Sequence, residues 1–156
     1  MDFLTDQEIE QLLTERKPMP ADWQKRLAQK PKRGHSEVEL DITGVRGSEF
    51  RVLLRRSNFN PLDFSVILAY RFPDSNQVLR LRRYNEKSHQ HRNPDEQHAF
   101  YDFHIHTATE RCQSSGNRED SFAEPTDRYA DLDSAMQCLF RDCGFEIPED
   151  PQGNLF

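Results

Sequence analysis

The stretch Phe64-Ser65-Val66-Ile67-Leu68-Ala69-Tyr70-Arg71-Phe72 carries the clearest structural signal in the chain. Large apolar side chains occupy every second position from Phe64 to Phe72, and the turn-forming segment Pro73-Asp74-Ser75-Asn76 follows directly. Side chains of a β-strand point alternately to its two faces, so this period of two predicts a long strand with one buried face.

Four further runs with the same period lie on either side of this strand, at residues 38–43, 50–55, 78–84 and 101–106. Turn-forming segments separate the runs. Alternating runs with short connections are typical of antiparallel strands, each with one buried and one wet face. The sequence therefore predicts an α+β fold built on a five-stranded antiparallel meander sheet.

Helices are expected before and after these runs. Residues 1–30 are predicted to form an N-terminal helical extension, because Thr5 and Glu8 have capping-box spacing, and Lys30–Gly34 is expected to be a linker. Residues 130–143 place apolar side chains on one helical stripe, which predicts a helix covering one face of the sheet. We expect a single α+β domain over residues 36–147, with a polar, mobile excursion at 111–128.

The formal net charge of −6 is unevenly distributed over the 156 residues. Residues 46–92 carry 10 basic and 4 acidic groups, a net of +6, whereas residues 93–156 carry 4 basic and 14 acidic groups, a net of −10. A polyanionic partner is therefore not excluded, because the local field follows the local charge.

No run of 18 apolar residues occurs, and the N-terminus is acidic, which argues against a membrane span or a signal peptide. The three cysteines, Cys112, Cys138 and Cys143, cannot form a closed disulfide framework. A reducing, cytoplasmic setting is therefore expected.

Five of the six histidines lie within 18 residues: His89, His91, His98, His104 and His106. In a strand, positions i and i+2 point to the same face about 7 Å apart, so His104 and His106 are expected to point together, with Asp102 beside them. Arg80 and Arg82 alternate with Leu79 and Leu81, which predicts that both arginines lie on the same wet face as the histidines.

Three interpretations of this cluster remain open. In the first, Arg80 and Arg82 bind phosphate while His89, His91, His104 and His106 act as acid and base in metal-independent RNA cleavage, with Tyr84 as a proton donor or stacking partner. In the second, the four histidines and Asp102 bind zinc or nickel, although no known zinc motif is present. In the third, the histidines belong to an ordinary polar surface. No cofactor is expected under the first or the third.

The segment Leu81-Arg82-Arg83-Tyr84-Asn85-Glu86-Lys87-Ser88-His89-Gln90-His91 joins a strand end to a His-x-His pair. This pattern resembles the TumE-like toxins of bacterial toxin–antitoxin systems. Together with Phe103-His104-Ile105-His106 and the last helix, it also resembles an uncharacterised bacterial family of similar layout. The resemblance covers about 70 residues, from Phe50 to about Thr107 plus the last helix. The N-terminal extension and the 111–128 segment depart from the toxin pattern.

The resemblance implies a small bacterial protein that acts on RNA and is held by an acidic or protein partner. Its candidate residues are Arg82, Tyr84, Asn85, His89 and His91. We therefore expect a toxin-like ribonuclease or an RNA-binding protein. The alternative is a non-enzymatic interaction module, a homodimer or a partner-bound protein, in which the basic 46–92 surface and the acidic 93–156 segment serve assembly.

Overall fold

The predicted meander is present in the computed structural model, which describes residues 3–28, 30–32, 34–85, 103–115 and 122–148. The strands of the sheet are β2 (Lys30–Lys32), β3 (His35–Thr43), β4 (Glu49–Ser57), β5 (Phe64–Arg71), β6 (Val78–Asn85), β7 (Phe103–Thr107) and β8 (Phe122–Thr126). They lie in chain order, and every neighbouring pair is antiparallel. The α+β class and its antiparallel meander are therefore confirmed, since β3 to β7 correspond to the five predicted strands.

The two outer strands were not predicted. β2 lies in the segment expected to be a linker and pairs with β3, while β8 lies in the expected excursion at 111–128 and pairs with β7. Short α3 (Glu110–Ser115) also lies in that excursion. Edge strands are held by backbone hydrogen bonds to a single neighbour and need no alternating apolar side chains, so hydrophobic periodicity does not reveal them.

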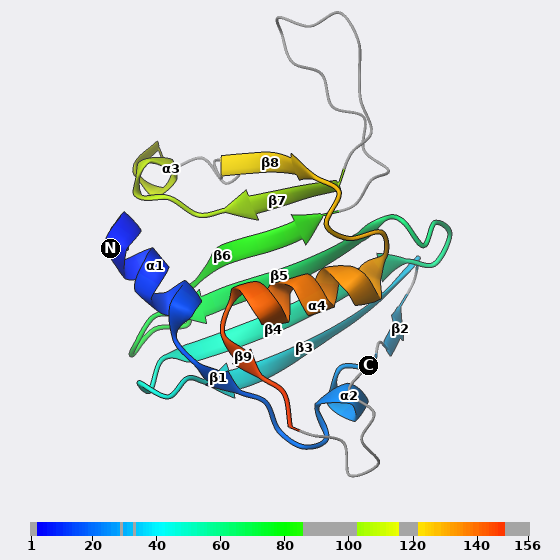
Figure 1. Ribbon diagram of the computed structural model, residues 1–156, viewed down its shortest axis with the longest axis horizontal. Coiled ribbons are helices and arrows are strands. Elements are labelled where there is room, and N and C mark those ends of the chain that lie inside the picture. Colours follow the sequence, from blue (N-terminus) through cyan, green and yellow to red (C-terminus); the bar gives the residue numbers. More distant parts are fainter. Residues whose placement is uncertain (1–2, 29, 33, 86–102, 116–121, 149–156) are drawn as a thin grey trace, which may run out of the picture.

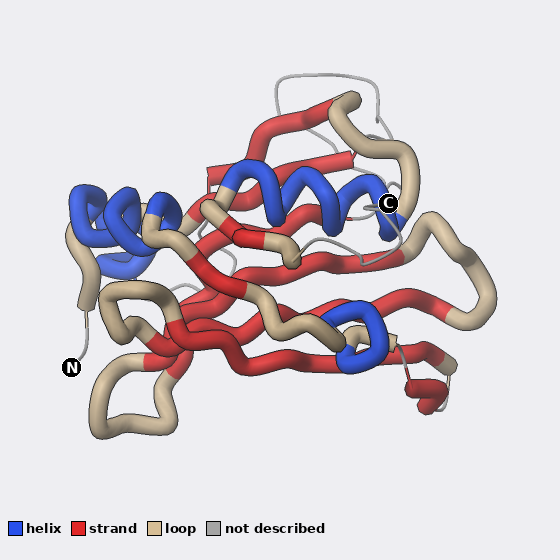
Figure 2. Tube along the Cα trace, turned by 60° about the horizontal axis from the view of Figure 1, so that its bottom comes forward, coloured by secondary structure: helices blue, strands red, loops and turns tan. Residues whose placement is uncertain are grey.

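Helix α4 (Leu132–Asp142) lies across one face of the sheet, over β5 and β6 (Figure 1). We call this side the helix face and the opposite side the distal face. Helices α1 (Asp6–Thr14) and α2 (Trp23–Arg26) lie on the same side as α4 (Figure 2). The predicted helix over 130–143 and its placement on the sheet are thus confirmed.

The N-terminal helices belong to the same hydrophobic core as the sheet. Ile9, Leu12 and Trp23 are buried together with the inward side chains of β4 and β5, and Trp23 contacts the ring of Phe140 edge-on at 5.4 Å. α1 begins at the predicted capping box, in which Thr5 accepts from the Glu8 backbone N–H and the Glu8 carboxylate accepts from that of Thr5.

The segment after α1 is fixed by a buried lysine. Two short strands, β1 (Lys17–Pro18) and β9 (Phe145–Glu146), pair in parallel, so the chain just after α1 lies beside the chain just after α4. The fully buried Lys17 ammonium donates to the carbonyls of Leu12, Leu13, Glu15 and Cys143 at 2.6–3.1 Å, and lies 4.5 Å from the Phe50 ring centroid. One cation therefore caps the C-terminal ends of α1 and α4 at the same time.

Gly144 makes this junction sterically possible. Its φ is +73°, a left-handed conformation that costs other residues about 1–2 kcal/mol. A Cβ at this position would lie 2.9 Å from the Glu15 carbonyl oxygen. Glycine therefore ends α4 where the backbones of the two junction segments approach each other, as expected for a residue directly after a helix.

Candidate functional site

A β-bulge in β6 divides the predicted arginine pair between the two faces. The β5–β6 ladder pairs Leu68 with Arg82 but Ala69 with Arg80, so Leu81 is an extra residue. Arg82 therefore shares the helix face with buried Leu68, whereas Arg80 lies on the distal face. The prediction that Arg80 and Arg82 lie together was wrong, because one inserted residue inverts the alternation.

Tyr84 also lies on the helix face, opposite Val66. Its hydroxyl donates to Asp142 Oδ2 at 2.6 Å, and burial raises its pKa. Arg128 binds the same carboxylate through two hydrogen bonds of 2.7 and 2.9 Å. Although burial opposes ionisation, the hydrogen bonds from Arg128 and Tyr84 lower the pKa of Asp142.

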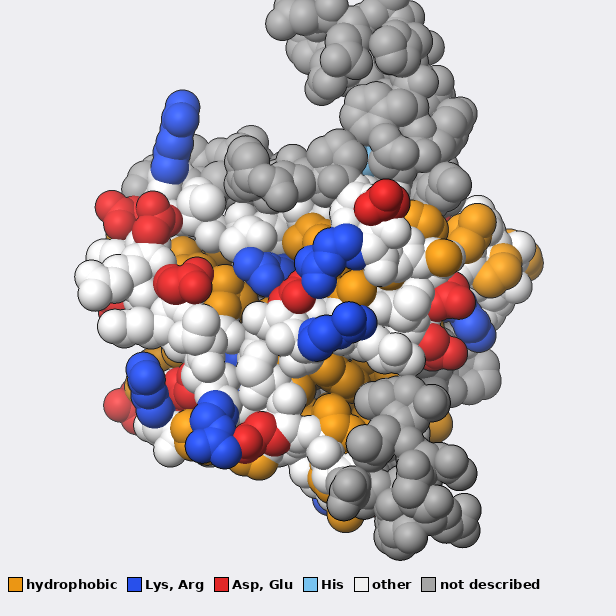
Figure 3. All heavy atoms as spheres, viewed as in Figure 1, with side chains coloured by type: hydrophobic (Ala, Val, Ile, Leu, Met, Phe, Trp, Pro, Cys, Tyr) orange, Lys and Arg blue, Asp and Glu red, His pale blue; other side chains and the backbone are white. Residues whose placement is uncertain are grey.

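This polar cluster joins β6 to the end of α4. Arg82 is half-buried beside it, and its charge favours the ionised forms of both Asp142 and the Cys143 thiol. Burial outweighs that effect for Cys143 and raises its pKa to about 11. Acidic and basic side chains lie close together over α4 on this face (Figure 3). Arg82 and Tyr84 are thus engaged in packing the helix onto the sheet, on the face opposite the β7 histidines.

Both β7 histidines lie on the distal face, as predicted. His104 is opposite Asn85 and His106 is opposite Arg83, with the two imidazole centroids 6.3 Å apart. Ser65 Oγ donates to Asn85 Oδ1 at 2.9 Å, and Asn85 Nδ2 lies 3.4 Å from His106 Nε2. His104 is only 4% exposed, whereas His106 is partly exposed, so a ligand can reach only one of these two imidazoles.

Basic residues dominate one half of the distal face. β5, β6 and β7 contain no Asp or Glu, and they place Arg71, Arg80, Arg83 and His106 on this face. We call these four residues the basic strip. On the neighbouring β4, Arg51 is 2.7 Å from Asp41, and Arg55 is 3.5 Å from Asp63. Glu49 of β4 lies opposite Arg71, so the basic side chains farthest from the acidic residues of β3 and β4 are those of β6 and β7.

Several predicted site residues, His89, His91, His98 and Asp102, lie outside the described residues. Within the described ranges, no three His, Cys, Asp or Glu side chains come together in a way that could hold a metal ion. No helix in these same ranges is long and apolar enough to cross a membrane.

An apolar groove of about 470 Å³ lies on the helix face, between α2 and α4. Trp23, Leu27, Leu132 and Met136 line it, and hydrophobic side chains are visible there in Figure 3. None of the predicted site residues lines this groove.

Sequence reasoning missed the polar contacts made by two side chains, Lys17 and Asp142. Neither Lys17 nor Asp142 was singled out as a candidate residue. One sequence feature could have indicated the bulge. Tyr84 is a large aromatic residue at an even-numbered position, whereas the apolar residues Leu79 and Leu81 are at odd-numbered positions, so a regular strand could not bury all three on one face.

The described elements from α1 to α4 coincide closely with one family model. The DUF6978 model, which describes a family of unknown function, matches residues 4–143. The chain belongs to the DUF6978 family. The DUF6978 match includes the N-terminal helices as well as the sheet and α4, in keeping with their common core. No curated protein and no solved structure matches the chain significantly. The resemblance to TumE-like toxins therefore stays a prediction.

Proposed function

We propose that this protein binds RNA through the basic strip on the distal face of its sheet. The observation that carries the proposal is the charge of the three adjacent strands β5 to β7. They hold no acidic residue and direct Arg71, Arg80, Arg83 and His106 to one side. Arginine guanidinium groups bind phosphate oxygens through paired hydrogen bonds, so such a strip suits a polyphosphate backbone.

Polar groups beside the strip support RNA as the polyanion. Ser65, Asn85 and His106 form a hydrogen-bonded row across β5, β6 and β7. Hydroxyl, amide and imidazole groups can hydrogen-bond the 2′-hydroxyl, which distinguishes RNA from DNA. The difference in affinity between an RNA and a DNA oligonucleotide of the same sequence measures the contribution of the 2′-hydroxyl contacts.

Binding, rather than cleavage, is the function that the described residues support. Metal-independent cleavage by the predicted residues needs an acid and a base at one phosphate. Of the β7 pair, His104 is buried, and the Tyr84 hydroxyl is bonded to Asp142 on the other face. Ribonuclease activity through His89 and His91, and with it a toxin role, stays a prediction. Incubation of RNA with the protein tests it, and recovery of intact RNA would contradict it.

The proposal includes a cytoplasmic location. Cys138 and Cys143 are both free and buried thiols. Thiols in this state are typical of proteins from reducing compartments, where cellular RNA is also present.

Charge reversal at Arg80 and Arg83 tests the proposal. The Arg80→Glu/Arg83→Glu double variant should bind a labelled RNA oligonucleotide at least about tenfold more weakly, because it loses two phosphate contacts. The slope of log affinity against log salt should fall by about 1.4, that is, about 0.7 for each contact to a single strand. Fluorescence anisotropy titrations at several KCl concentrations measure both quantities.

The matched control is Arg56→Glu/Arg141→Glu. It changes the net charge by the same amount, but at two exposed arginines on the helix side of the protein. This control should retain most of the wild-type affinity. Equal affinities of wild type and the Arg80/Arg83 variant would contradict the proposal, as would the absence of RNA binding at low salt. Failure of RNA binding combined with salt-dependent self-association would favour the interaction-module alternative.

A further inference from the structure

The β4–β5 hairpin holds an aromatic side chain in solvent. Phe59 is 86% exposed and is the most exposed large hydrophobic residue in the described ranges. Val45 follows at 55%. Single exposed apolar residues are common on protein surfaces, so the exposure of Phe59 acquires meaning only from its surroundings.

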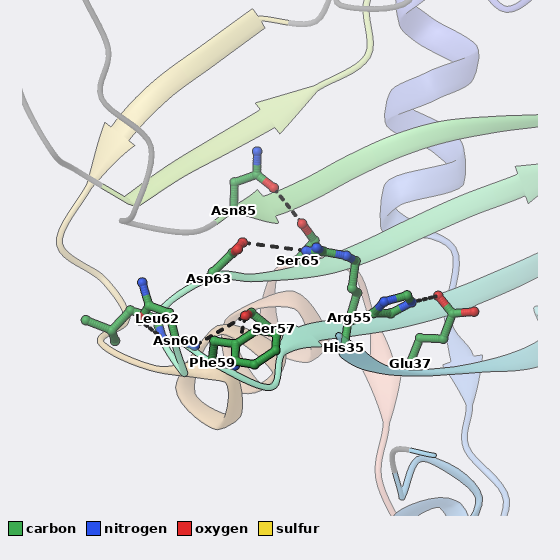
Figure 4. A network of polar contacts seen from close by, with 10 residues as sticks. All are labelled: His35, Glu37, Arg55, Ser57, Phe59, Asn60, Leu62, Asp63, Ser65 and Asn85. Atoms are coloured by element: carbon green, nitrogen blue, oxygen red, sulfur yellow. Dashed lines mark hydrogen bonds and ion pairs between the residues drawn. The ribbon is translucent and has the colours of Figure 1, made fainter. Parts of the chain in front are cut away.

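The hairpin around Phe59 is fixed by its own hydrogen bonds (Figure 4). Ser57 Oγ accepts from the backbone N–H groups of Phe59 and Asn60 at 3.1 and 3.2 Å. Asn60 Oδ1 accepts from the Leu62 N–H, and the Ser57 N–H donates to the Asp63 carbonyl. A preorganised loop loses little conformational entropy when its side chain contacts a ligand.

A further bond ties the hairpin to its neighbour. The Asn58 N–H donates to the Gly34 carbonyl at 3.1 Å, and Ser36 Oγ donates to Asn58 Oδ1 at 3.0 Å. The strand β3 thus supports the loop from the side. Phe59 is therefore held on a rigid support and remains almost fully accessible.

The hairpin lies at the end of the sheet toward which the basic strip runs. Ser65, the second residue of β5, lies beside the hairpin and bonds Asn85 at the end of β6 (Figure 4). From Ile67, which pairs with Arg83, to Asp63 the chain spans four residues, or about 13 Å at strand spacing. Asp63, the acidic residue at the base of the hairpin, is compensated by Arg55.

We infer that Phe59 stacks against an unpaired base of an RNA strand whose phosphates lie on the basic strip. This inference rests on the proposed function and narrows its substrate class to single-stranded RNA. Stacking on an aromatic face requires an unstacked base, which a duplex does not offer at its sides. Arginines that contact phosphates beside an exposed aromatic side chain form the usual combination in single-strand binding.

The test compares a short unstructured RNA with the same RNA annealed to its complement. Phe59→Ala should weaken binding of the single strand about tenfold, because the stacked base loses its partner. It should leave the affinity for the duplex and the salt slope unchanged, because the phosphate contacts remain. Val45→Ala, which removes another exposed apolar side chain at the opposite end of β4, is the matched control and should bind as wild type.

A second variant, Phe59→Trp, provides a readout that does not depend on affinity. The only natural tryptophan, Trp23, is 5% exposed and gives a constant background. Stacking should retain single-strand binding in this variant and quench the exposed indole when the single strand is added. Duplex RNA should cause no comparable quenching.

The two proposals fail in different ways. If Phe59→Ala binds the single strand as tightly as wild type while Arg80→Glu/Arg83→Glu loses binding, the stacking inference is wrong and RNA binding by the strip stands. An equal loss for single strand and duplex also overturns the stacking inference. If the wild type binds neither RNA, the proposed function itself is wrong.

Discussion

Lys17→Met should lower the free energy of unfolding by about 3–5 kcal/mol, the size of loss seen when one partner of a buried charged contact is removed. Methionine keeps the unbranched stem but donates no hydrogen bond. The carbonyls of Leu12, Leu13, Glu15 and Cys143 would all lose the buried ammonium that they now share. Burial lowers the pKa of Lys17 to about 8, so the group still carries its charge at pH 7.

Urea denaturation followed by circular dichroism at pH 7 measures this loss. Arg16→Met is the matched control, because Arg16 is the preceding residue, is exposed, and forms a surface ion pair with Glu146. The control should change the free energy of unfolding by no more than about 0.5–1 kcal/mol. A loss below about 1 kcal/mol for Lys17→Met would show that water can replace the ammonium at this junction.

Asp142→Asn should cost about 2–3 kcal/mol at pH 7, because hydrogen bonds to charged groups contribute more than neutral ones. The amide keeps one oxygen for Tyr84 but cannot accept both Arg128 donors or compensate the half-buried Arg82. Asp133→Asn on the exposed side of α4 is the control, and it should alter stability by about 0.5 kcal/mol at most.

We also expect the stability difference between wild type and Asp142→Asn to depend on pH, with a definite sign. The pKa of Asp142 is lower in the folded state than in the unfolded chain, where it is about 3.9. The unfolded state therefore binds more protons as the pH falls, so this part of the stability is complete above pH 5 and is lost through the folded pKa. The difference in urea midpoint between wild type and Asp142→Asn should shrink from pH 6 to pH 3. A constant difference would contradict an ionised Asp142.

The strands that alternate strongly could be predicted from the sequence because their pattern reflects burial on one face. The run from Phe64 to Phe72 and the stripe of α4 both follow from local periodicity. β2 and β8 could not be predicted in this way, because an edge strand is held by hydrogen bonds to the backbone of one neighbouring strand and needs no alternating apolar side chains. The capping box at Thr5 was predictable because both partners lie within four residues.

The predicted site depended on which face of β6 each residue occupies, and one extra residue in a strand inverts that assignment for all residues after it. A single extra residue at Leu81 moved Arg82 and Tyr84 to the helix face and brought Arg83 to the distal face. The partner of Tyr84 lies 58 residues away, and one of the four acceptors of Lys17, the Cys143 carbonyl, lies 126 residues away, so no local pattern shows how these two side chains are bonded. Phe59 lay in a loop whose rigidity comes from side-chain bonds to backbone N–H groups, which hydropathy does not report.

The junction around Lys17 has a consequence for the order in which the protein folds. The backbone bonds that hold β1, from Lys17 to Gly144 and from Met19 to Glu146, need residues that are synthesised after α4. The meander can form as its strands emerge, since each strand pairs with the strand that precedes it in the chain. The contacts that the end of α1 makes through this junction therefore form only after α4 has been synthesised. Closure of the fold is thus a late event, in which the segment after α4 pairs with the segment after α1.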